Sequence, residues 1–141
     1  MIARSDLGPV LVAAMAAGCH MVVPPEEVAE PADTWGPLAV VEDSGGMEAL
    51  ATGIVRIDRD CVYLDTPPRD LVLVWDADRT RWEPPGGILF ETFGGEVVAI
   101  QNGQRLAFGG GDGNSSFEWV NAPDPGCPSD KWLISDVAPP D

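Results

Sequence analysis

The sequence predicts an all-β fold, a small antiparallel barrel of about five to six strands. From Gly53 onward, short β-favouring runs alternate with turn residues. The 141 residues include 14 Pro and 16 Gly, which favours turns and extended segments over long helices. No segment shows convincing helical spacing. Closure into a barrel would remove the exposed edges that such short strands otherwise present.

The first two predicted strands, residues 53–57 and 61–64, form a hairpin around a short turn, and Cys61 opens the second strand. The next strand is residues 71–75. Its residues are all apolar, which indicates a central strand buried on both faces. Alternation places Trp75 on the same face as the first and third residues of this strand, as expected of a core side chain.

The remaining strands are predicted from short apolar runs bounded by turn residues, at 88–90, 96–100, 105–108 and 131–134. We expect the second and third of these to pair as a hairpin, because the Asn102-Gly103 dipeptide between them favours a tight turn. Residues 83–87, Glu-Pro-Pro-Gly-Gly, exclude regular structure before the first of them. The glycine-rich residues 109–116 predict a flexible loop.

The N-terminus has the layout of a signal peptide, which we expect to cover residues 1–18. Residues 7–17 are mostly apolar and follow Arg4 and the terminal amine. A helix of this length spans only about 17 Å, against a hydrocarbon core of about 30 Å, which excludes a permanent transmembrane helix.

The leader ends Met-Ala-Ala-Gly-Cys19, and small residues running into a cysteine resemble the lipobox of bacterial lipoproteins. In that family the signal peptidase cuts before the cysteine, whose thiol and new amine receive acyl chains such as palmitate. The resemblance implies lipidation of Cys19 and a place on the outer face of the cytoplasmic membrane. The sequence departs from the pattern at Ala16, where Leu is commonest, and at Asp6, which weakens the positive end. Cleavage without lipidation, giving a secreted protein, and a buried or cytosolic helix are the alternatives.

Four segments are expected from this organisation. The signal peptide is followed by an acidic, proline-rich tether over residues 19–49, because residues 24–33 contain little apolar surface to bury. The β-barrel domain covers residues 50–136, and residues 137–141 form a tail. About 90 residues remain for the core, enough for one domain.

The formal net charge is −15, from 8 Lys and Arg against 23 Asp and Glu. Nucleic acid and anionic lipid headgroups are therefore disfavoured as partners. Solubility accounts for the charge more simply than capture of divalent cations does. A protein or carbohydrate partner is compatible with the charge, and the sequence specifies neither.

With Cys19 set aside for lipid, Cys61 and Cys127 remain in a chain that we expect to be exported, and a single disulfide is their natural pairing. Two unpaired buried thiols are the alternative. Two cysteines and the lone His20 of the tether cannot complete a closed zinc shell.

The order of motifs also resembles a group of small actinobacterial secreted or lipoprotein domains. These motifs run from Gly53 to residue 134: a Cys opening a strand, Leu-Val-Leu-Val-Trp, Trp-x-Pro, a hairpin, Gly-Gly-Gly, and a second Cys before Trp-Leu-Ile. The resemblance implies an exported, OB-like barrel with a disulfide, and it carries over no catalytic residue, ligand or cofactor. Asp76 departs from it, because such sequences often continue this Trp with Pro.

Nucleophilic catalysis is nearly excluded, because the only histidine lies in the predicted tether. Carboxylates are plentiful, and a pair of them could act on a glycan. They fall at turns, however, where Asp commonly bonds its own backbone. The carboxylates in question are Asp58, Asp60, Asp65, Asp76 and Asp78.

Two short segments have the alternating spacing of calcium ligands, Asp76 with Asp78 and Asp112 with Asn114. Phe117 stands where a calcium loop has its glycine and Pro123 where it has its glutamate, so plain loops are the preferred interpretation.

Four tryptophans, at 75, 82, 119 and 132, are many for a small domain. Burial in the core is the preferred interpretation, but Trp82 and Trp119 are candidates for an exposed platform that binds sugar rings or a protein. The sequence therefore predicts a lipid-anchored envelope protein whose barrel is a binding or structural module without enzymatic activity. A secreted hydrolase of cell-wall carbohydrate and a soluble exported protein that binds a partner are the alternatives.

Overall fold

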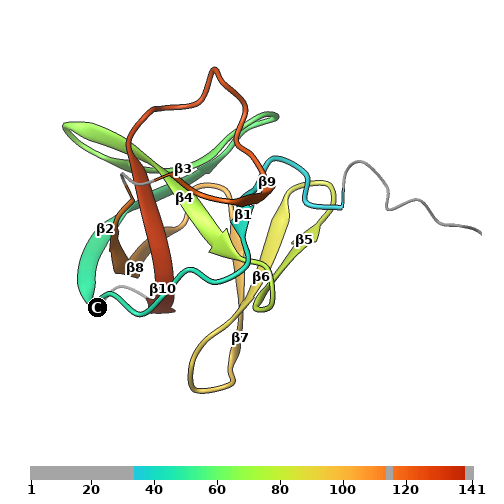
Figure 1. The fold of residues 1–141 in the computed structure, drawn as a ribbon, viewed down its shortest axis with the longest axis vertical. Helices are drawn as coiled ribbons and strands as arrows, with labels where there is room; N and C mark the ends of the chain where they lie inside the picture. The colour runs from blue at the N-terminus through green and yellow to red at the C-terminus, as the bar shows by residue number, and fades with distance from the viewer. Residues whose placement is uncertain (1–33, 114–115, 139–141) are drawn as a thin grey trace, which may run out of the picture.

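The computed structural model describes residues 34–113 and 116–138 of the chain (Figure 1). These residues form ten strands and no helix, which confirms the predicted all-β class. The strands are β1 (Ala39–Val41), β2 (Ala49–Ile57), β3 (Val62–Thr66), β4 (Arg69–Asp76), β5 (Thr80–Glu83), β6 (Gly87–Glu91), β7 (Val97–Gln101), β8 (Arg105–Asp112), β9 (Trp119–Asn121) and β10 (Lys131–Ala138). The described residues contain no helix that could cross a membrane. The leader and Cys19 lie outside the described residues.

Five strands close into a barrel in the order β2-β3-β4-β10-β8, and β8 pairs back onto β2. Neighbours in the barrel are antiparallel except β4 and β10, which are parallel, so the barrel is mixed. The barrel begins with the three-stranded meander β2-β3-β4 and continues with β8 and β10. Its last strand, β10, is parallel to β4, which is the topology of an OB-like barrel. The predicted barrel is therefore confirmed, with β1 and β9 added outside β4.

The core is organised around β4, which is buried on both faces as its apolar sequence predicts. Trp75 is fully buried inside the barrel, where its ring meets Phe90 and Phe108 edge-on, with centroids 5.9 and 6.0 Å away. On the other face of β4, Val72 and Val74 form a second cluster with residues of the neighbouring parallel strand β1, and Phe117 and Trp119 pack against this cluster. This double burial fixes the strand at the centre of the domain.

Between β4 and β8 the chain forms a separate three-stranded antiparallel sheet, β5-β6-β7, to one side of the barrel (Figure 1). Its inner side chains complete the barrel core, since Ile88, Phe90 and Ile100 are fully buried there. Residues 83–87 were expected to exclude regular structure, but only 84–86 do so, as the turn of the β5–β6 hairpin. Glu83 ends β5 and pairs with Gly87, which begins β6.

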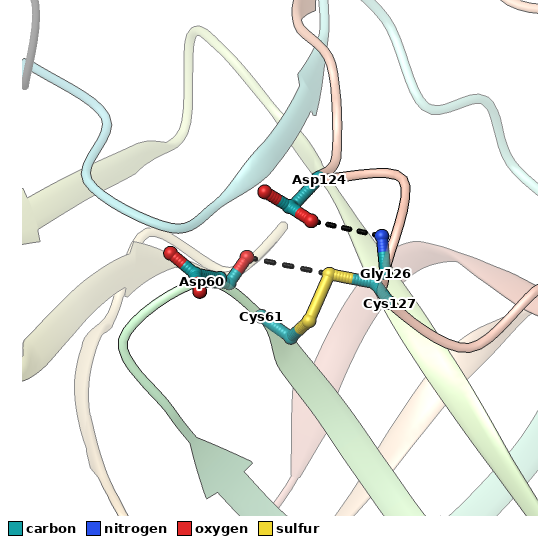
Figure 2. Close-up of a disulfide and its surroundings, with 5 residues drawn as sticks. All are labelled: Asp60, Cys61, Asp124, Gly126 and Cys127. Atoms are coloured by element: carbon teal, nitrogen blue, oxygen red, sulfur yellow. Dashed lines mark hydrogen bonds between the residues drawn. A yellow bond between two sulfur atoms is a disulfide. The ribbon is translucent and has the colours of Figure 1, made fainter.

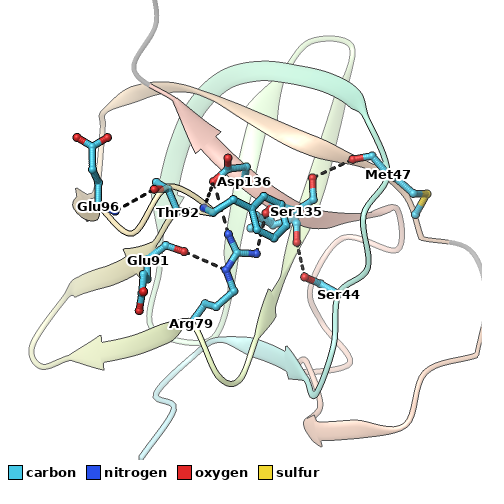
Figure 3. A network of polar contacts seen from close by, with 10 residues as sticks. Ser44, Met47, Arg79, Glu91, Thr92, Glu96, Ser135 and Asp136 are labelled. Atoms are coloured by element: carbon cyan, nitrogen blue, oxygen red, sulfur yellow. Dashed lines mark hydrogen bonds and ion pairs between the residues drawn. The ribbon is translucent and has the colours of Figure 1, made fainter.

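Arg79, in the turn before β5, fastens this sheet to the barrel (Figure 3). Its guanidinium lies over the rings of Phe90 and Phe93, at 4.7 and 3.9 Å from their centroids. It donates hydrogen bonds to the carbonyl oxygen of Ser135 on β10, at 2.8 Å, and to that of Glu91 on β6, at 3.0 Å. One side chain therefore joins β6 to β10. Its charge is balanced by the carboxylate of Asp136 on β10, 3.5 Å away, as well as by the aromatic faces and the carbonyl dipoles.

The predicted hairpin between residues 96–100 and 105–108 is wrong. Both strands form, but β7 pairs with β6, whereas β8 pairs with β2 and β10. The turn between them is anchored on β2: Gly103 donates its N–H to the carbonyl oxygen of Val55, and the Asn102 side chain accepts one from Ile57 N–H, both at 2.8 Å. The Asn-Gly turn thus carries the chain from one sheet to the other.

The flexible loop predicted at residues 109–116 is also wrong over its first half, because residues 109–112 continue β8. Glycine is required here by close approach of neighbouring backbone. A Cβ at Gly110, whose φ is +155°, would lie 2.9 Å from the carbonyl carbon of Leu133 on β10. Gly110 is therefore a strand residue with no room for a side chain.

Both predicted domain boundaries need correction. The tether was expected to reach residue 49, but Leu38 and Val40 are fully buried in the core and β1 pairs with β4. The tail was expected from residue 137, but Val137 is buried and β10 extends to Ala138. The folded domain thus includes residues 34–49 as well as Val137 and Ala138, because their apolar side chains supply part of its core.

Candidate functional site

A cleft formed of two adjoining hollows lies beside the β2–β3 turn. The first, of about 390 Å³, is lined by Ile57, Asp58, Trp82, Pro85, Gly86 and Asn102 together with three shared residues. The second, of about 220 Å³, is lined by Asp60, Asn121, Ala122 and Asp124 together with the same three. The shared residues are Gly36, Pro37 and Arg59. We call the two hollows together the Trp82 cleft.

Trp82 forms one wall of this cleft. It comes from β5, is half-buried, and packs partly against the main core. The backbone of Gly36 lies against its indole so closely that a Cβ there would be 2.8 Å from Cδ1 of the ring. Gly36 also has a φ of +53°, which L residues with side chains rarely adopt. Position 36 is therefore restricted to glycine, and the indole is fixed in place.

Arg59 stands at the junction of the two hollows, at the tip of the β2–β3 turn. Among the described residues its guanidinium makes no ion pair or hydrogen bond. The nearby Arg56 of β2 behaves differently, since it pairs with Asp65 across the hairpin at 3.2 Å. Arg59 is exposed, so its five N–H donors face solvent and are accessible to a ligand.

Two asparagines line the cleft with one end of each amide fixed. Asn102 accepts a hydrogen bond through Oδ1 from Ile57 N–H at 2.8 Å, which leaves its NH₂ group to donate. Asn121 donates through Nδ2 to the carbonyl oxygen of Leu38 at 2.7 Å, which leaves its Oδ1 to accept. Each backbone partner settles the orientation of its amide. The cleft therefore offers an oriented donor in the first hollow and an oriented acceptor in the second.

The disulfide between Cys61 and Cys127 fastens the two sides of the second hollow together (Figure 2). It confirms the predicted pairing. Cys61 follows Asp60 directly, and Cys127 lies in the turn where Asp124 accepts a hydrogen bond from Gly126 N–H at 2.8 Å. The Sγ of Cys127 also lies 3.3 Å from the carbonyl oxygen of Asp60. The bridge fixes the position of one side of the hollow relative to the other.

The calcium candidates are not assembled into a site. Asp76 is buried and accepts a hydrogen bond through Oδ1 from Asp78 N–H at 2.9 Å, so it closes its own turn. Asp112 pairs with Arg69 at 3.5 Å, and Asn114 lies outside the described residues. Within residues 34–113 and 116–138, no three His, Cys, Asp or Glu side chains are grouped so that they could hold a metal ion.

The tryptophans do not form a common surface. Trp75 and Trp132 are buried in the core, and Trp119 is half-buried against Phe117, with ring centroids 4.9 Å apart, in the cluster outside β4. Of the two aromatic candidates, Trp82 lines the cleft and Trp119 does not.

Sequence reasoning did not single out Arg59, Asn102 or Asn121. Arg59 and Asn102 stand in segments whose sequences indicate turns, and nothing in them signals that two turns distant in the chain meet beside Trp82.

Comparisons of the chain with protein-family models, with curated proteins and with solved structures find no match.

Proposed function

We propose that this protein is a lipid-anchored module of the bacterial cell envelope that binds a ligand in the Trp82 cleft and carries out no catalysis. In this proposal Cys19 bears the lipid on the outer face of the cytoplasmic membrane. The residues between Cys19 and Thr34 are the spacer between the membrane and the barrel.

Two features support export and anchoring. The lipobox-like end of the leader supplies a cysteine preceded by small residues. The bridge between Cys61 and Cys127 is independent support, because disulfides persist mainly in oxidising compartments outside the cytosol.

The observation that carries the binding proposal is the set of polar groups in the two hollows of the Trp82 cleft that the described residues leave without a partner. These are the guanidinium of Arg59, the NH₂ of Asn102 and the Oδ1 of Asn121. The cleft lies between the β2–β3 turn and the β8–β10 connection, and OB-like barrels commonly use these two loops for binding. Fold position alone would be an analogy, so the proposal depends on these side chains.

Co-sedimentation with washed bacterial envelopes tests this function. The chain carrying Cys19→Ala is used, so that lipid insertion cannot contribute. We expect the protein to sediment with the envelopes and Arg59→Gln to weaken this about tenfold, as expected for loss of one charged hydrogen-bonding partner. Arg81→Gln is the matched control, because Arg81 is well exposed on the small sheet and lines neither hollow.

The same samples are assayed for released reducing ends, which we expect to stay at background. Release that Asp60→Asn abolishes would contradict the proposal and establish a carboxylate-dependent hydrolase instead. Equal sedimentation of the parent protein and Arg59→Gln would show that the cleft is not the binding site.

A further inference from the structure

We infer that the ligand of the Trp82 cleft is a carbohydrate chain that places successive sugar units in the two hollows. The inference rests on the proposed function, since it names the chemical class of the ligand for the same cleft. It follows from the chemistry of each hollow and from the way the two are joined.

The first hollow suits one face of a sugar ring. Its wall is apolar, formed by Trp82, Pro85 and Ile57, and its polar groups are Asn102, Asp58 and Arg59. A pyranose carries C–H groups on its faces and hydroxyl groups around its edge. Stacking the C–H face on the indole would therefore leave the hydroxyl groups directed towards the planar amide and guanidinium.

The second hollow suits the hydroxyl groups of a sugar, because it offers polar side chains and no aromatic wall. It contains no aromatic side chain, and its polar lining consists of Arg59, Asp60, Asn121 and Asp124. Arg59 supplies donors, whereas the carboxylates and Asn121 Oδ1 supply acceptors. A hydroxyl group both donates and accepts, so one polyhydroxyl unit can satisfy this mixture.

Arg59 belongs to both hollows, which explains why a chain fits better than a single sugar. Its five donors could hold neighbouring units at once, one stacked on Trp82 and the next between the two loops. The disulfide keeps the second hollow at a fixed width, so little ordering is needed when the ligand binds.

Other ligand classes match these groups less well. A nucleic acid would bring phosphates towards Asp58, Asp60 and Asp124 in a protein with a formal charge of −15. A purely apolar ligand would leave the polar groups of the second hollow desolvated and unpaired. A peptide backbone offers few donors to the carboxylates unless it carries basic side chains.

Nuclear magnetic resonance of the ¹⁵N-labelled full chain with Cys19→Ala tests the assignment. The probes are cellotetraose, maltotetraose and the tetramer of N-acetylglucosamine, titrated separately. The five tryptophans give separate indole N–H signals, and Trp82→Phe identifies the one in the cleft. We expect at least one tetrasaccharide to shift the signals of Trp82, Arg59 and Asn102, while the indole of buried Trp75 stays unchanged.

Two variants and one control assign the contacts. Arg59→Gln should weaken saccharide binding about tenfold, and Trp82→Phe should weaken it about three- to tenfold while keeping a ring against Gly36. Arg81→Gln should bind like the parent protein. Equal affinity of the parent and both cleft variants would overturn the inference.

A proline-rich decapeptide, titrated in parallel, separates failure of the inference from failure of the proposed function. If only the peptide moves the cleft signals, the ligand class is wrong and the binding module remains. If neither probe class moves them and co-sedimentation is also absent, both the inference and the binding function are wrong.

Discussion

Removing the Cys61–Cys127 bridge should lower the free energy of unfolding by about 4 kcal/mol. The two cysteines are 66 residues apart in sequence, and closing a loop of that length restricts the unfolded chain by about this amount on the chain-entropy model. Domains of this size are stable by only about 5–15 kcal/mol, so the bridge supplies a large share of the total.

The assay is urea unfolding of the Cys61→Ala, Cys127→Ala double variant, followed by tryptophan fluorescence because Trp75 and Trp132 are buried. With a slope of about 1.5 kcal/mol per molar urea, the midpoint should fall by about 2–3 M. Parent protein treated with a reductant is the control and should unfold at the same urea concentration as the double variant.

A loss of less than about 1 kcal/mol would refute the reasoning, because it would mean that the unfolded chain keeps the two segments close without the bridge. The double variant could lose stability while the reduced parent protein does not. That result would show that the loss comes from altered side-chain packing and not from the missing bridge. Cys127 does pack against the cluster outside β4, so this comparison is needed.

Three further outcomes are expected. Gly110→Ala should destabilise the domain by more than about 3 kcal/mol in thermal unfolding, because its Cβ would meet the Leu133 carbonyl, whereas Gly46→Ala, with open space around it, should change stability by less than about 0.5 kcal/mol. Arg79→Ala should cost about 1–3 kcal/mol and loosen the small sheet, which hydrogen exchange of β6 amides would detect. Burial, together with nearby Asp side chains, raises the pKa of Tyr63, the only tyrosine, so its absorbance at 295 nm should titrate above pH 10. The stability linked to neutral Tyr63 should be complete below pH 10 and be lost as the pH rises through that higher pKa.

The fold class and the central strand could be predicted because their signals are local. Five consecutive apolar residues in β4 require burial on both faces, and the structure provides it through the barrel core on one side and the cluster covered by Phe117 and Trp119 on the other. The cysteine pairing was predictable from an even count and expected export, and the bridge is present.

The strands that pair with β7 and with β8 could not be predicted, because a tight turn between two strands does not determine whether they pair with each other. The Asn102-Gly103 turn forms as its sequence favours, but its backbone and side-chain hydrogen bonds go to β2. Glycines 109–111 indicated a loop for a similar reason. The requirement for glycine at position 110 of β8 depends on the close approach of the Leu133 backbone, which is distant in sequence.

The candidate site could be predicted only in part. Trp82 was identifiable as an aromatic candidate, but the polar groups around it come from three segments that meet only in the folded chain. Asn102 was visible only as a turn residue, because the hydrogen bond that orients its amide is tertiary. Arg59 was likewise visible only as a turn residue, because its place beside Trp82 depends on the folded chain.

The central claim, that this barrel is held at the membrane through Cys19, is tested most directly by the intact mass of the protein made in a bacterial host. Detergent phase partitioning of the same sample is compared with that of Cys19→Ala. We predict a chain that begins at Cys19 and carries acyl groups, found in the detergent phase, with both properties lost in the variant. An unprocessed chain in the aqueous phase would contradict the anchor and remove the lipobox argument for export, leaving the disulfide as its only support.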